Sequence, residues 1–153
     1  MQRKSKYKTG DCLSLKCSDG AFIAAIITGT FKSYYDMTLI EYRSEGTPKA
    51  INFQKGKFFG TREGSLENIN YLVDKCMIKM TWLDMSKNVG YVCSLNLPAT
   101  VAKASYCYVN NIDDLLKYYT EELPIRIKKS KNAELFAETG FMSKHLIDLI
   151  HLS

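Results

Sequence analysis

The sequence predicts an α+β fold in which a small curled antiparallel sheet is followed by short helices. Apolar and polar residues alternate over residues 9–109, with turn residues between the runs. After Asn111, apolar residues recur at helical spacing instead. The chain has 153 residues, of which 46% are hydrophobic and 24% are charged, a composition that suits one soluble domain with its own core. We therefore expect a single domain over residues 1–153, with a basic and flexible arm at 1–8.

The first strands are predicted to form a meander. Leu13 and Leu15 alternate with polar residues, and the Ser-Asp-Gly stretch at 18–20 is typical of a tight hairpin turn. The following run, AFIAAIITGTF, is apolar on both faces and predicts a central strand that is covered on both sides. Residues 34–42 alternate again, so a third antiparallel strand is expected there.

Later runs predict the rest of the sheet. Residues 44–65 carry four glycines and one proline, which predicts turns around short strands at 50–53 and 57–59. Alternation over 71–84 predicts a long strand. Further strands are expected at 105–109 and in the stretch VGYVCSLNL.

The part of the chain over 110–153 is predicted to be mainly helical. Asn111 is suited to cap a helix over 112–123 that ends before Pro124. Alternation at 124–128 predicts one strand that rejoins the sheet and closes it like a barrel. Two short helices are expected after it, over 133–139 and 143–151.

Residues that could hold a metal or perform catalysis are sparse. The five cysteines are unevenly spaced and form no Cys-x-x-Cys pair, so we expect reduced and mostly buried thiols. His145 and His151 are six residues apart on a predicted helix and therefore face different directions. We expect no cofactor, no metal site and no enzymatic activity. A cysteine nucleophile with a distant histidine base stays open as an alternative.

The net charge of +5 comes from two basic clusters. The clusters are Arg3, Lys4, Lys6 and Lys8, and Arg126, Lys128, Lys129 and Lys131. The rest of the chain carries 13 basic and 16 acidic residues, so the surface is not expected to be uniformly basic.

The sequence predicts a cytoplasmic protein without a membrane partner. Its longest apolar run, Ala21 to Ile27, has seven residues, whereas a membrane helix needs about 20. The basic start is followed by Thr9, Gly10 and Asp11, where the apolar region of a signal peptide would begin.

The region around residues 53–62 interleaves aromatic and cationic side chains. This pattern favours nucleic-acid binding as the main alternative function, since stacking platforms on small barrels have it. It is also typical of a half-buried edge strand. Aromatic and arginine side chains tend to anchor interfaces. The candidate partner-binding residues are Tyr34, Tyr35, Lys55, Lys57, Phe58, Phe59 and Arg62.

The first quarter of the chain resembles a known family. The pattern is Lys8-Thr9-Gly10-Asp11, an alternating strand, Ser18-Asp19-Gly20-Ala21-Phe22, and a long apolar strand with Ala24 and Ala25. Over residues 6–43 it resembles the immunity protein 26 family of bacterial polymorphic-toxin systems. The resemblance implies an SH3-like, partly open barrel. It also implies an immunity protein that binds and neutralises one cognate toxin without catalysis, and it carries over no contact residues.

Overall fold

The computed structural model describes residues 5–65, 68–97, 104–106 and 141–148, with the shorter stretches 114, 117–122, 124–125 and 128–129. The strands are β1 (Asp11–Lys16), β2 (Phe22–Phe31), β3 (Tyr34–Ser44), β4 (Lys57–Ser65), β5 (Asn68–Lys79), β6 (Val89–Ser94), β7 (Ala104–Tyr106) and β8 (Phe141–Asp148). The helices are α1 (Ala50–Lys55), α2 (Met80–Asp84) and one π-helical turn, η2 (Tyr118–Glu122). This is the expected small fold, rich in β-strands and with few short helices.

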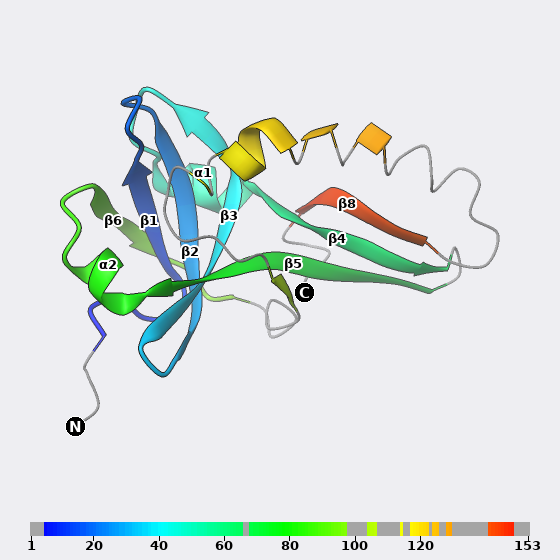
Figure 1. Cartoon of the computed structure of the whole chain (residues 1–153), viewed down its shortest axis with the longest axis horizontal. Coiled ribbons are helices and arrows are strands. Elements are labelled where there is room, and N and C mark those ends of the chain that lie inside the picture. The colour runs from blue at the N-terminus through cyan, green and yellow to red at the C-terminus, as the bar shows by residue number, and fades with distance from the viewer. Residues whose placement is uncertain are drawn as a thin grey trace.

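The strands form one open sheet in the order β6-β1-β2-β3-β4-β5-β7, and β8 pairs with β4. The pairings are antiparallel except for the parallel pair β5 and β7. β3 also pairs directly with β5, because β5 leaves β4 after Val73 and continues along β3. Figure 1 shows β4, β5 and β8 extending away from the part of the molecule that contains β1, β2, β3 and β6.

The predicted meander of the first three strands is confirmed. β1 pairs with β2 and β2 pairs with β3, both antiparallel. The Cys17 N–H donates to the Ala21 carbonyl at 2.8 Å, and Gly20 adopts a φ of +88°, which favours glycine in this turn.

The central strand β2 is covered on both faces, as predicted. Ile23, Ala25 and Ile27 belong to a first core, whereas Ala24 and Ile26 belong to a second core on the other side. Members of the first core also come from β1, β3, β4, β5 and α2, and members of the second core also come from β1, β3, β4, β5 and α1. The apolar run of the sequence therefore reflects burial on two sides.

Two expectations about the middle of the chain are wrong. Residues 50–53 form the start of α1 and not a strand, because Lys49 and Asn52 exchange hydrogen bonds that begin a helical turn and Phe53 packs into the second core. The long strand expected over 71–84 ends at Lys79. There the Met80 N–H donates to the Ser33 carbonyl, and α2 follows with Met80 and Leu83 in the first core.

The expectations for the C-terminal part are also corrected. Residues 141–148, most of them expected in a helix, form β8, because β4 offers its free edge along Lys57 to Gly64. Pro124, Ile125 and Lys128, expected in a strand, are helical, and 58% of Ile125 is exposed. Within the expected helix 112–123, the described residues are helical, and they end in η2. The helix expected at 133–139 and residues 107–109 lie outside the described residues.

None of the helices in the described part of the chain is long and apolar enough to cross a membrane.

Candidate functional site

Beyond the second core, the same face of the sheet continues towards the β2–β3 turn. Residues that pair directly on neighbouring strands place their side chains on the same side of a sheet. One row of residues runs across β2, β3 and β5 next to the β2–β3 turn. A second row lies two residues further along each strand, away from the turn. We call the surface made by both rows the Phe31 face: Phe31, Tyr34 and Lys79 in the first row, and Gly29, Asp36 and Met77 in the second.

The Phe31 face mixes exposed apolar and charged groups. Phe31 is 56% exposed, Lys79 is exposed, and Tyr34, Asp36 and Met77 are half-buried. At the turn, Lys32 has a φ of +54° and its Nζ lies 5.4 Å from the centre of the Phe31 ring. An aromatic ring and an ammonium group are therefore presented together at the end of the hairpin.

A buried ion pair lies at the inner border of this face. Lys75 is paired across the strands with Thr38, is 1% exposed, and holds its Nζ 3.9 Å from Asp36 Oδ2. Burial lowers the pKa of Lys75, and the negative charge of Asp36 opposes that shift. Asp36 thus connects the exposed face to a charge inside the protein.

On the opposite side of the sheet, Tyr35 ties three segments together. Its hydroxyl donates to Asp84 Oδ1 in α2 and accepts a hydrogen bond from the Tyr7 N–H at 3.2 Å. The Tyr7 and Tyr35 ring centres are 5.9 Å apart. Burial and the bond to Asp84 raise the pKa of Tyr35 to about 12, so the hydroxyl stays a donor at neutral pH. This network fixes residues 6–8 beside α2 and the start of β3.

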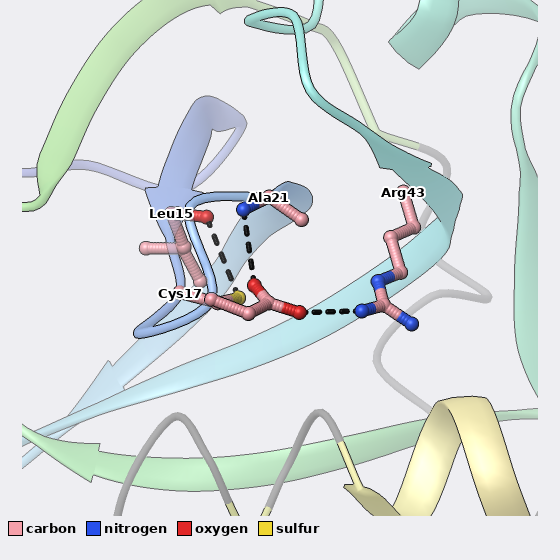
Figure 2. A network of polar contacts seen from close by, with 5 residues as sticks. Leu15, Cys17, Ala21 and Arg43 are labelled. Atoms are coloured by element: carbon pink, nitrogen blue, oxygen red, sulfur yellow. Dashed lines mark hydrogen bonds and ion pairs between the residues drawn. The ribbon is translucent and has the colours of Figure 1, made fainter.

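The Asp-Gly turn of the sequence motif has a structural role. Figure 2 shows the Ala21 nitrogen and the Arg43 guanidinium directed at one carboxylate, that of Asp19. The Ala21 N–H donates to Asp19 Oδ1 at 3.0 Å, and Arg43 bonds the other oxygen at 2.5 Å. The Ala21 bond and then Arg43 lower the pKa of Asp19. The carboxylate therefore fixes the β1–β2 turn against the end of β3.

The structure separates the candidate residues predicted from the sequence. Tyr34 lies on the Phe31 face. Tyr35, Phe58 and Phe59, which were predicted as partner-binding residues, are buried instead, at 0%, 1% and 9% exposure. Phe58 points into the second core and Phe59 into the first, because alternate residues of β4 face opposite sides.

Three cationic candidates remain predictions. Lys55 and Lys57 are exposed, near the end of α1 and the start of β4. Arg62 lies in β4, opposite Tyr71 and Ser143 in the register. Phe31 and Met77 were missed, because the sequence shows neither the register of three strands nor the exposure of one row.

The described residues contain no group of three or more His, Cys, Asp and Glu side chains that could hold a metal ion. Cys12, Cys17 and Cys76 are buried free thiols, and Cys93 is a half-buried one. Burial, with Cys93 opposite it on β6, raises the pKa of the Cys12 thiol. This thiol therefore stays protonated, which is the reverse of what a nucleophile requires.

No family model, curated protein or solved structure matches this chain.

Proposed function

We propose that this chain is a non-enzymatic binding protein that holds one protein partner, and that the partner is a cognate toxin that it neutralises. The Phe31 face carries this proposal. Phenylalanine, tyrosine and methionine are enriched at protein interfaces, and Phe31 keeps more than half of its surface in water although a core lies next to it. A partner that covers Phe31 removes this apolar surface from water.

The composition of the face favours a protein over a nucleic acid. Asp36 lies in the middle of the second row between Gly29 and Met77, so this row offers no cation to a phosphate group. Met77 beside it offers an apolar contact and no hydrogen-bond donor. Both features suit the apolar centre and polar rim of a protein interface.

The toxin as partner comes from the resemblance of residues 6–43 to immunity proteins, and so does the SH3-like, partly open barrel. The antiparallel meander of β1, β2 and β3, with β6 beside β1, supports this part of the proposal.

Co-expression with the product of the adjacent reading frame tests the function. We expect that product to be lethal alone, and growth to be restored when this chain is co-expressed. Phe31→Ser should weaken the rescue, and Ile51→Ser should not, because Ile51 is similarly exposed, at 47%, but lies on α1. An adjacent toxin whose lethality this chain does not relieve would contradict the proposal.

A titration with mixed single- and double-stranded oligonucleotides tests the alternative. Binding through phosphates releases counterions, so it weakens steeply between about 50 and about 200 mM salt. Sub-micromolar binding at low salt that falls about tenfold or more at high salt would replace the toxin by a nucleic acid. We expect no such binding.

A further inference from the structure

We infer, on the basis of the proposed function, that the partner presents acidic groups around an apolar contact and is captured by the end of the sheet next to the Phe31 face. We call this end the basic end and define it by four exposed lysines: Lys6, Lys8, Lys32 and Lys79.

Three separate segments bring these lysines to one end of the molecule. Lys32 lies in the β2–β3 turn, and Lys79 pairs with Tyr34 where β3 begins. The Tyr7 N–H bonds the hydroxyl of Tyr35, which places Lys6 and Lys8 beside the same strand start. Figure 1 shows the N-terminal segment, α2 and the β2–β3 turn at this end.

The lysines of the basic end are not held by carboxylates in the described part of the chain. None of the four lysines forms an ion pair with a described residue. The nearby carboxylates are engaged elsewhere: Asp36 pairs with Lys75, Asp84 accepts the Tyr35 hydroxyl, and Asp11 accepts the Lys8 N–H and the Ser94 hydroxyl. Carboxylates of a partner can therefore pair with these lysines without breaking an ion pair between described residues.

The combination of charge and apolar surface defines the partner. A cluster of like charges attracts an oppositely charged protein over about one Debye length and raises its association rate. Phe31, next to Lys32 and in one row with Lys79, then supplies the apolar contact. The partner surface that fits is an apolar patch with Asp or Glu residues at its rim.

The test measures the rate of association with a catalytically inactive form of the toxin encoded beside this chain, at about 50 and about 200 mM salt. The double variant Lys32→Glu and Lys79→Glu is compared with the control Lys16→Glu and Lys87→Glu. Both variants change the charge equally. The control residues lie at the other end of the sheet, where the Lys16 N–H bonds the Asn88 carbonyl and Lys16 pairs with the first residue of β2.

We expect the association rate at low salt to fall about tenfold or more for the basic-end variant, and the difference to shrink at high salt. The control should stay within about threefold of the wild-type rate. Thermal unfolding checks that both double variants fold. If the basic-end variant does not fold, the double variant Lys32→Gln and Lys79→Gln is used in its place.

The outcomes separate this inference from the proposed function. If the wild-type protein binds and neutralises the toxin but the basic-end variant associates as fast as the control, the inference is wrong and the function stands. If the wild-type protein neither binds the toxin nor restores growth, both the inference and the proposed function are wrong. Oligonucleotide binding that is lost in the basic-end variant would show that the lysines contact phosphates and would also overturn the inference.

Discussion

Lys75 is buried in β5, although lysine side chains are almost never fully buried unless they are paired. Its partner Asp36, at 3.9 Å, is too far away for a hydrogen bond but close enough for an ion pair. A buried pair of this kind gains little, because removing two charges from water offsets much of their attraction. The pair is therefore expected to contribute little to the stability of the folded chain.

Replacing Lys75 by Met is expected to lower the free energy of unfolding at neutral pH by less than about 2 kcal/mol, under the roughly 3–5 kcal/mol lost when the removal of one partner leaves a fully buried charge. Met removes the buried charge and keeps much of the volume. The carboxylate left behind is 18% exposed and can be hydrated. Denaturant unfolding at neutral pH measures the change, with the exposed Lys79→Met as control. A loss of more than about 2 kcal/mol would show that the ion pair is strongly stabilising.

The lowered pKa of Lys75 also makes the free energy of unfolding of the wild-type protein depend on pH. In the folded chain, Lys75 releases its proton more readily than in the unfolded chain, because folding lowers its pKa below the usual value of 10.5. The unfolded chain then binds more protons between these two values, so stability rises with pH across this window and is lost as the pH falls through the folded pKa. Tyr35, whose pKa is raised to about 12, has the opposite effect at high pH. The wild-type minus Lys75→Met difference isolates Lys75, and we expect it to change in favour of the wild type as the pH rises.

Gly10 connects three strands at the start of the sheet. Its N–H donates to the Ile27 carbonyl at 2.7 Å, and its carbonyl accepts the Leu95 N–H at 2.9 Å. A φ of +95° and a Leu95 oxygen only 2.2 Å from where a Cβ would lie leave no room for a side chain. The Gly-Asp pair of the sequence motif is thus explained by the way β1 meets β2 and the chain after β6.

Gly10→Ala is expected to destabilise the protein more than Gly20→Ala. Both glycines have a positive φ, and either substitution pays about 1–2 kcal/mol for that conformation. A Cβ at Gly20 meets no atom within 4 Å, whereas one at Gly10 collides with backbone. The difference between the two unfolding free energies therefore measures the collision. Equal losses would show that the Leu95 segment moves away at no cost.

At the level of the whole molecule, two cores share one strand. Ile26 and Ile27 are neighbours in β2 and both are 0% exposed, yet Ile26 packs in the second core and Ile27 in the first. The stability of the fold accordingly depends on covering β2 from both sides.

Ile26→Ala and Ile27→Ala are each expected to lower the free energy of unfolding by roughly 2–5 kcal/mol, as for a fully buried aliphatic side chain. Ile51→Ala should change it by less than about 0.5 kcal/mol, because 47% of Ile51 is exposed. Chemical denaturation of the three variants provides the comparison. A small loss for only one of the buried pair would mean that its core is not closely packed.

Local patterns along the chain were sufficient to predict the β1–β2–β3 meander, its turn at Gly20 and the burial of β2 on both faces. In each case the deciding interaction joins residues that are close in the sequence, or follows from alternation along one strand.

The tertiary structure decided what depends on a distant partner. The stretch 141–148 pairs with a strand more than 70 residues earlier, and this pairing makes β8 a strand although its sequence suits a helix. Met80 leaves the sheet because Ser33 holds its backbone. The candidate site belongs to this group as well. Tyr34 was recognised as an aromatic residue, but only the register that sets it between Phe31 and Lys79 makes these three side chains one surface.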